Sequence, residues 1–175
     1  MAGQTLSSNQ IYHGQAVKLR VDTIEKPTGK KTTREIVEHA DCVAVVTLDE
    51  QKNVVMVRQF REAVAKTLLE IPAGGIDAGE NPVDAVRREL QEEIGFLPQN
   101  IERIGGFYST PGYCTEYLYL YLATDLKPSQ LNAEDTENIE VVKVPLSQIP
   151  KLIASGEICD SKSIAGLLSY LHLEG

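Results

Sequence analysis

Three glutamates lie close together in one short stretch of this 175-residue chain, RRELQEEIGF at residues 87–96. In a helix, which turns 100° per residue, Glu89 and Glu93 would lie about 40° apart and Glu92 about 60° to their other side. Carboxylates on one face repel one another unless a cation lies between them. Oxygen ligands of this kind suit Mg²⁺ or Mn²⁺, and no His or Cys set with zinc spacing competes. Taken alone, the stretch is also compatible with an ordinary solvated helix face.

A helix over residues 82–94 would present these carboxylates together. Asn81 can cap its start, Pro82 suits its first position, and Gly95 suits the position just beyond its last turn. Apolar residues recur at spacings of three and four, which predicts one buried stripe along the helix. They are Val83, Val86, Leu90 and Ile94.

The segment before this helix, IPAGGIDAGE at residues 71–80, is rich in glycine and can fold tightly. It would bring the Ala73 carbonyl and Glu80 toward the start of the helix. From Gly74 the chain reads glycine, five residues, Glu80, seven residues and then RELQEEIGF. This arrangement resembles the Nudix box, GX5EX7REUXEEXGU with U a bulky apolar residue, and it matches at every fixed position.

The resemblance implies an α/β (α+β) fold, an αβα sandwich with a mixed central sheet and an N-terminal β-hairpin. It also implies that a loop–helix–loop motif binds Mg²⁺, or Mn²⁺ in its place, for hydrolysis of a nucleoside diphosphate linked to another group. Glu80 and Arg88 would shape the motif rather than touch the substrate. The metal ligands that the family pattern assigns are the carbonyl of Ala73 and the carboxylates of Glu89, Glu92 and Glu93.

Runs of alternating or β-branched residues predict further strands. The expected strands cover residues 16–24, 32–39, 42–48, 53–60, 67–71, 101–108, 115–123 and 139–144. Residues 1–9 are polar and are expected to be loose. A helix interrupted by Pro150 is expected at 146–156, and another at 161–173 with Asp160 as its cap. The residues of that last helix expected to face inward are Ile164, Leu167, Leu168 and Leu171.

Outside the box, the chain resembles the ADP-ribose pyrophosphatase branch of the family. The segments that carry this resemblance are TTREIVEHADCVAVV, VRQFREA, LLEIPAGGIDAGE and STPGYCTE. The branch hydrolyses ADP-ribose to AMP and ribose 5-phosphate. A diphosphate that enters an acidic cleft needs countercharge, which arginine supplies well. The candidate substrate-binding residues are Arg34, Glu35, Arg58, Arg61, Gly75, Pro111, Gly112 and Glu116.

Some of these candidates have plainer interpretations. A single arginine is commonly a surface charge, and Pro111-Gly112 is also typical of a hairpin turn. Aromatic residues that could stack on adenine are few, and packing in the core or on the surface explains each of them equally well. They are Tyr12, Tyr108 and Tyr113.

The general base must come from outside the box. The acidic segment LNAEDTENIE at residues 131–140 lies between two expected strands. The resemblance implies that this segment supplies the base, whereas the sequence alone is equally typical of a solvated acidic loop. The candidates are Glu134, Asp135 and Glu137, and the choice among them stays open.

The resemblance implies a homodimer in which residues 1–40 form N-terminal strands exchanged between protomers, while residues 41–175 form the Nudix domain. Exchange would also cover apolar residues of the hairpin such as Val17 and Leu19. The three cysteines are far apart and lack metal or disulfide spacing, which favours a reduced, cytoplasmic protein with Cys42 in the core.

The composition restricts the function. The net charge of −8, with no basic stripe, argues against general binding of nucleic acid or anionic membranes but not of small phosphorylated ligands. No apolar run approaches the roughly 18 residues that a membrane span requires. Alternatives that stay open are hydrolysis of another nucleoside diphosphate derivative, such as a dinucleoside polyphosphate or NADH, and a non-catalytic nucleotide-sensing module. The intact acidic residues argue against the sensor.

Overall fold

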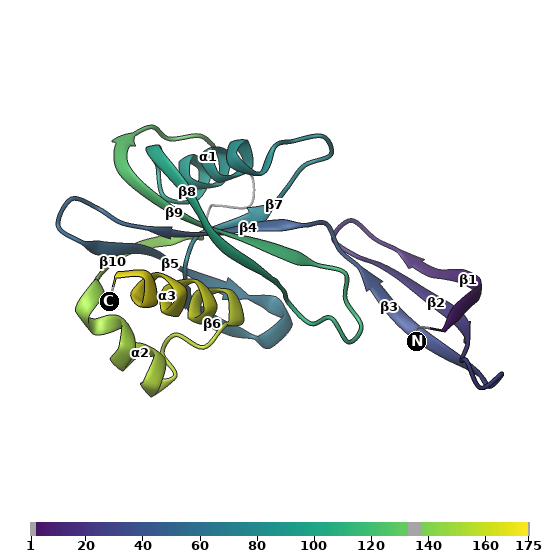
Figure 1. Ribbon diagram of the computed structural model, residues 1–175. Helices are drawn as coiled ribbons and strands as arrows, with labels where there is room; N and C mark the ends of the chain where they lie inside the picture. The colour runs from purple at the N-terminus through teal and green to yellow at the C-terminus, as the bar shows by residue number, and fades with distance from the viewer. Residues whose placement is uncertain (1–2, 133–137, 175) are drawn as a thin grey trace. The chain divides into compact units, whose positions relative to one another are not determined.

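The computed structural model of the chain describes residues 3–132 and 138–174 (Figure 1). The chain divides into two compact units. Unit 1 combines Met1–Asp41 with Tyr108–Tyr117, and unit 2 combines Cys42–Phe107 with Leu118–Gly175. No helix in the described part of the chain is long and apolar enough to span a bilayer.

Unit 1 contains an antiparallel three-stranded sheet in the order β1-β2-β3. Its strands are β1 (Gln4–His13), β2 (Lys18–Glu25) and β3 (Lys31–Glu38). The expected hairpin is formed by β2 and β3, and the turn between them contains Gly29 in the left-handed region at φ 80°. Glycine adopts this conformation without the steric cost that a Cβ would add.

The expectation that residues 1–9 are loose was wrong for residues 4–9, and residues 1 and 2 lie outside the described part of the chain. From Gln4 onward, the chain pairs with β2 in a register that begins at Gln4 and Glu25. Every residue of β1 is exposed, so the strand lacks the alternation of apolar and polar residues that marks a half-buried strand in a sequence. Backbone pairing with a neighbouring strand, rather than burial of side chains, defines β1.

Unit 2 contains two sheets. The first has the order β7-β4-β9-β8, and in it β4 (Cys42–Thr47) runs parallel to β9 (Tyr117–Pro128) and antiparallel to β7 (Ala73–Gly75). This sheet is therefore mixed, as predicted. The second has the order β10-β5-β6. The remaining strands are β5 (Asn53–Arg61), β6 (Lys66–Glu70), β8 (Phe96–Tyr108) and β10 (Glu140–Pro145).

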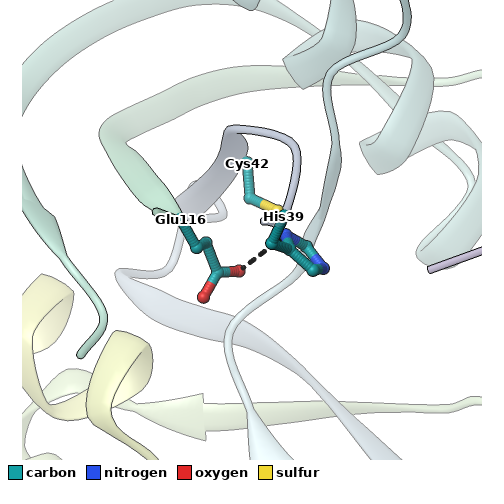
Figure 2. Close-up of side chains that lie close together, drawn as sticks. All are labelled: His39, Cys42 and Glu116. Atoms are coloured by element: carbon teal, nitrogen blue, oxygen red, sulfur yellow. Dashed lines mark ion pairs between the residues drawn. The ribbon is translucent and has the colours of Figure 1, made fainter. Parts of the chain in front are cut away.

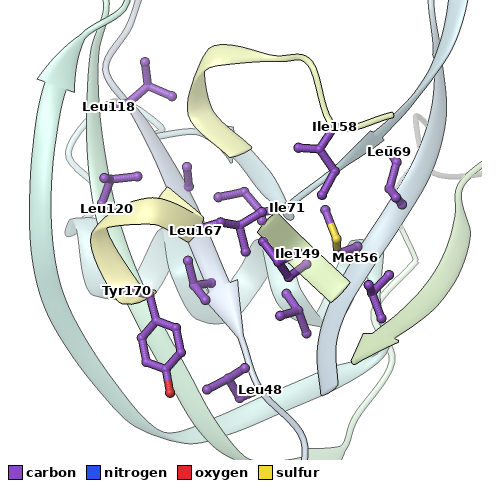
Figure 3. Close-up of a cluster of buried hydrophobic side chains, with 14 of the residues drawn as sticks. Leu48, Met56, Leu69, Ile71, Leu118, Leu120, Ile149, Ile158, Leu167 and Tyr170 are labelled. Carbon is purple, nitrogen blue, oxygen red and sulfur yellow. The ribbon is translucent and has the colours of Figure 1, made fainter. Parts of the chain in front are cut away.

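The helices of unit 2 lie on opposite faces of β4. Ala44 and Val46 join a buried cluster with residues of α2 (Ile149–Ser155) and α3 (Ser161–Glu174), shown in Figure 3. Val43 and Val45 join a second cluster with residues of α1 (Pro82–Glu93). Because successive side chains of a strand point to opposite faces, β4 is buried on both sides. This helix–sheet–helix layering confirms the predicted αβα sandwich.

Two expectations about the C-terminal helices needed correction. Leu168, expected to face inward, is 47% exposed, because the buried face of α3 is centred on Leu167 and Tyr170 and Leu168 lies about 100° from Leu167. The segment 146–156 is not one interrupted helix. A 3-10 turn (Leu146–Gln148) leads into α2, and Pro150 occupies the first turn of α2, where its missing N–H does no harm.

Candidate active site

Local capping chemistry sets the ends of α1. The side chain of Asn81 accepts a hydrogen bond from the backbone N–H of Val83 at 2.9 Å, and Pro82 occupies the first turn. Gly95 follows the helix with φ 77°, in the left-handed region where glycine is favoured. The predicted cap, first residue and terminating glycine are therefore confirmed, and they fix which residues the last two turns of α1 present.

Arg88 holds the segment before α1 in shape. Its Nε and Nη2 atoms donate to the two carboxylate oxygens of Glu80, each at 2.9 Å, and Nη2 also donates to the Gly75 carbonyl at 2.8 Å. Glu80 further accepts from the N–H of Asp77 at 2.9 Å. The hydrogen bonds from Arg88 hold the pKa of Glu80 below its ordinary value. Glu80 and Arg88 thus shape the motif, as expected.

The same guanidinium supplies the cation between two of the three glutamates. Nη1 of Arg88 donates to Glu89 at 2.7 Å and to Glu92 at 3.3 Å. Glu93 instead accepts from the backbone N–H of Ala73 at 3.1 Å. Within the described residues, the three carboxylates do not bring one oxygen each to within 4.8 Å of one another. Arg88 and Ala73 separate them into two hydrogen-bonded groups.

Gly74 makes room for the Glu89 carboxylate. A Cβ at this position would lie 2.0 Å from the carboxyl carbon of Glu89, a distance that no side chain tolerates. The neighbouring Gly75 differs, since a Cβ there would meet nothing within 4 Å. The Glu89 carboxylate can therefore keep its place only while position 74 is glycine, and Gly75 has open space beside it.

The electrostatics of this group fit a divalent cation. Burial, followed by the charge of Glu89, raises the pKa of Glu93 to about 8. Burial also raises the pKa of Glu89, although Arg88 opposes the shift. Arg88 compensates the charge of Glu89 only in part, and Glu93 has no paired cation among the described residues, so a hard cation with oxygen ligands would supply the missing positive charge. Glu89, Glu92, Glu93 and the Ala73 carbonyl stay the predicted ligands of such an ion.

Two predicted arginines of unit 2 have different partners. Arg61, at the end of β5, forms a bidentate ion pair with the buried Glu70, with Nη2 at 2.6 Å from Oε2. Arg58 pairs instead with Glu157 at 2.8 Å on the surface. The charge of Glu93 raises the pKa of Arg61, after the larger effect of Glu70. Arg61 is therefore the predicted arginine whose charge acts on Glu93, whereas Arg58 is paired with Glu157.

Other predicted substrate contacts lie in unit 1. Arg34 and Glu35 line a cavity of about 490 Å³ together with Tyr113. Arg34 donates to the Thr33 carbonyl at 2.8 Å and is exposed. The other residues that line this cavity are Leu19, Thr33 and Val37.

Pro111 and Gly112 form a turn, and Glu116 follows it. The N–H groups of Tyr113 and Cys114 donate to the Thr110 carbonyl at 3.2 and 3.0 Å, which closes the turn. The N–H of Val37 in β3 donates to the Tyr113 carbonyl at 2.7 Å, and the Val37 carbonyl accepts from the N–H of Thr115 at 3.0 Å. Glu116 lies 3.6 Å from Nδ1 of His39 (Figure 2). The plainer interpretation of Pro111-Gly112 as a turn is therefore correct as to conformation, and their contact with substrate stays a prediction.

The candidate bases Glu134, Asp135 and Glu137 lie outside the described residues. Their roles stay predictions. Two residues beside the glutamate group were missed in the sequence. Glu70 was visible only as a charged residue in the apolar run TLLEI, and Lys162 only as a cation beside the predicted cap Asp160. Neither pattern indicates a partner, because these two residues are 92 positions apart.

Comparison with known proteins identifies the family. The NUDIX domain profile matches residues 38–165. The chain belongs to the Nudix family. The glutamates of α1, the preceding glycine segment and Arg88 are thus the box of a Nudix pyrophosphohydrolase, and the recognition made from their spacing is confirmed.

Several relatives of this Nudix chain match over nearly its whole length. It is 36% identical over 173 residues to an ADP-ribose pyrophosphatase of Bacillus subtilis, covering 98% of this chain and 93% of the relative. It is 35% identical, with the same coverage, to a methanol dehydrogenase activator of Bacillus methanolicus. An ADP-ribose pyrophosphatase of Mycobacterium tuberculosis is 34% identical, covering 95% and 82%.

A solved structure, described as an ADP compounds hydrolase, superposes with a TM-score of 0.91 at 19% sequence identity. The match covers 99% of this chain and 94% of the other. At this identity the similarity establishes the fold, and it agrees with the layering described above.

Proposed function

We propose that this Nudix enzyme hydrolyses the diphosphate of ADP-ribose, to AMP and ribose 5-phosphate, with Mg²⁺ as its metal. The observation that carries the proposal is the pair of carboxylates, Glu89 and Glu93, whose pKa values are raised within an intact box. The whole-length similarity to two ADP-ribose pyrophosphatases supports the choice of substrate.

In this proposal, Glu89, Glu92, Glu93 and the Ala73 carbonyl hold the metal. When bound, Mg²⁺ supplies positive charge to the diphosphate oxygens and lowers the pKa of water. The chain itself contributes the geometry of the ligands. Nη1 of Arg88 donates to both Glu89 and Glu92 and so holds the two carboxylates at one guanidinium, and the N–H of Ala73 orients Glu93. The first position of the box must stay glycine so that Glu89 can occupy its place.

Arg61 contacts the diphosphate in this proposal and stabilises the charge that develops on it. We assign Glu134, Asp135 or Glu137 as the base that accepts a proton from the attacking water. Arg34, Glu35, Gly75 and Glu116 stay predictions for substrate binding, as do Arg58, Pro111 and Gly112. A residue of this set that binds substrate should raise KM when replaced, because it contributes to binding in the ground state.

The proposal is tested by measuring hydrolysis of a panel of substrates and by comparing the unmodified protein with two variants. Purified protein is assayed with Mg²⁺ or Mn²⁺ against ADP-ribose, GDP-mannose, ADP-glucose, NADH, dinucleoside polyphosphates and nucleoside triphosphates, and the products are identified. Glu93→Gln should abolish turnover while the matched variant Glu102→Gln, an exposed position on β8, should leave it unchanged. Undiminished Mg²⁺-dependent hydrolysis by Glu93→Gln would refute the assignment.

The panel also separates the alternatives. GDP-mannose pyrophosphatases are among the relatives, at 31% identity over 152 residues for the Enterobacter protein. Preference for a compound other than ADP-ribose would keep the enzyme class and change the substrate. Absence of turnover with every compound, together with nucleotide binding, would favour the sensor.

We further propose a homodimer located in the cytoplasm. The described structure pairs none of Cys42, Cys114 and Cys159 in a disulfide, and their wide spacing in the sequence is typical of proteins of a reducing compartment. Leu6, Ile11 and Tyr12 of the N-terminal strand are exposed apolar residues that a second protomer would cover. Light scattering should give the dimer mass at micromolar concentration, and replacing these three residues by Ser should give the monomer mass. A monomer in the unmodified protein would contradict the proposal.

A further inference from the structure

Glu70 is a buried carboxylate that the predicted metal site does not use. It is the last residue of β6 and is 2% exposed. Nε of Arg61 donates to its oxygens at 3.2 and 3.1 Å, and Nη2 of Arg61 donates to Oε2 at 2.6 Å. Nζ of Lys162 donates to the same Oε2 atom at 2.6 Å. One carboxylate therefore joins two cations from different elements.

Lys162 belongs to the first turn of α3, and its neighbours attach that turn to the chain around Glu70. Nζ of Lys162 also donates to Asp160 at 2.9 Å, and the same oxygen of Asp160 caps the helix by accepting from the N–H of Ser163 at 3.0 Å. The hydroxyl of Ser163 accepts from the N–H of Ile71 at 2.9 Å. The start of α3 thus binds two consecutive residues that lead directly to Ala73.

The four charges of this group balance. A buried carboxylate is costly unless it is paired and hydrogen-bonded. Arg61 and Lys162 together neutralise Glu70 and Asp160, so Arg61 alone does not have to satisfy Glu70. Lys162 donates to the same oxygen, Oε2, that accepts from both Nε and Nη2 of Arg61.

This mode of pairing leaves one edge of Arg61 available. Among the described residues, no acceptor is hydrogen-bonded to Nη1 of Arg61, and its side chain is 38% exposed. The charges of Arg61 and Lys162 both lower the pKa of Glu93, against the larger effect of burial. The two cations are therefore close enough to act on a carboxylate of the glutamate group.

We infer that Lys162 is a positioning residue. Through Glu70, it holds Arg61 with its Nη1 edge free for a phosphate oxygen of the substrate. The inference rests on the proposed function, which assigns Arg61 to the diphosphate. Lys162 itself touches no substrate, and its effect on the reaction passes through the orientation of Arg61.

Steady-state kinetics of Lys162→Met test this role. We expect kcat to fall by roughly 10- to 100-fold and KM to change by less than about threefold, because a misoriented guanidinium loses charge stabilisation in the transition state. Lys162→Arg, which keeps a donor for Glu70, should recover most of kcat. Lys127→Met is the matched control, since Lys127 forms a surface ion pair with Asp125 at 2.7 Å. An unchanged kcat in Lys162→Met would overturn the inference.

Two further variants separate positioning from general loosening. Adding Lys162→Met to the Arg61→Lys variant should lower kcat further by less than about twofold. The reason is that Lys162 acts through Arg61, which is already replaced in this variant. Ser163→Ala removes the other attachment of α3, at Ile71, and should lower the melting temperature without reproducing the fall in kcat. Multiplicative effects in the double variant, or an equal fall in kcat in Ser163→Ala, would contradict a role through Arg61.

A readout without turnover separates this inference from the proposed function. If no diphosphate is hydrolysed, the proposed function fails, and solvent exchange of the Arg61 Nε–H is measured by NMR in the metal-free protein. Lys162→Met should accelerate this exchange because Glu70 no longer offers a fixed acceptor, and Lys127→Met should not. Unchanged exchange in Lys162→Met would overturn the positioning role.

Discussion

Metal-free protein should lose stability between pH 5 and pH 8 because of Glu93, and Glu93→Gln should remove that loss. The folded structure raises the pKa of Glu93 from its ordinary value of 4.5 to about 8. The folded state therefore binds more protons than the unfolded state between these two values. Stability is highest below the unfolded pKa and declines as the pH rises through the folded pKa.

The magnitude follows from the shift. Each unit of pKa difference corresponds to about 1.36 kcal/mol, so a single isolated group shifted this far would cost at most about 5 kcal/mol. Glu89 shares the negative charge of the site and its pKa is also raised, so the two carboxylates titrate as a pair. We expect the free energy of unfolding of Glu93→Gln, relative to that of the unmodified protein, to increase by about 3 to 5 kcal/mol between pH 5 and pH 8.5.

Urea unfolding in EDTA, repeated at half-unit pH intervals, measures this difference. Glu102→Gln, at an exposed position on the same unit, should follow the unmodified protein at every pH. Saturating Mg²⁺ should stabilise the unmodified protein increasingly as the pH rises, by about 2.7 kcal/mol when the ion is at 100 times its Kd. Parallel curves for Glu93→Gln and the unmodified protein in EDTA would refute the argument that burial of Glu93 creates the demand for a cation.

Two further predictions concern the box and its helix. Gly74→Ala should weaken Mn²⁺ binding, measured by electron paramagnetic resonance, at least about 10-fold because its Cβ displaces the Glu89 carboxylate, whereas Gly75→Ala should keep the affinity within about twofold. Equal affinities in the two variants would contradict the role assigned to Gly74. Asn81→Ala should lower the free energy of unfolding by about 1 kcal/mol through loss of the bond to the Val83 N–H, as measured by urea unfolding. A change below about 0.3 kcal/mol would show that Pro82 and packing define the helix start without the cap.

The parts of the structure that could be predicted from the sequence depend on local chemistry. The ends of α1 follow from Asn81, Pro82 and Gly95, each of which acts within one turn of the helix. The buried strands β4 and β5 follow from runs of β-branched residues. By contrast, β1 carries no such pattern, because all of its residues are exposed and pairing with β2 alone defines it.

In the candidate site, too, contacts between residues close in the sequence could be predicted, and contacts between distant elements could not. The spacing of the box places Glu80, Arg88 and Glu89 within reach of one another, since they lie on one helix and the loop before it. The Glu70–Lys162 pair could not be predicted, because its two residues belong to distant elements that only the packing of α3 brings together. A lysine beside a helix cap is common on protein surfaces, and only burial of its partner distinguishes this one.

The three glutamates of the box differ in which groups compensate their negative charge. This difference predicts how much each glutamate contributes to metal binding. Glu89 and Glu92 share the Nη1 atom of Arg88, whose other nitrogens are held by Glu80 and Gly75. Glu93 has a backbone N–H and only the longer-range charges of Arg61 and Lys162. A neutral N–H compensates the negative charge of a carboxylate less than a guanidinium does. The negative charge of Glu93 is therefore less compensated than the charges of Glu89 and Glu92. The interaction with Glu93 should therefore contribute most to the binding free energy of a cation at this site. Replacing Glu93 should weaken metal binding more than replacing Glu92.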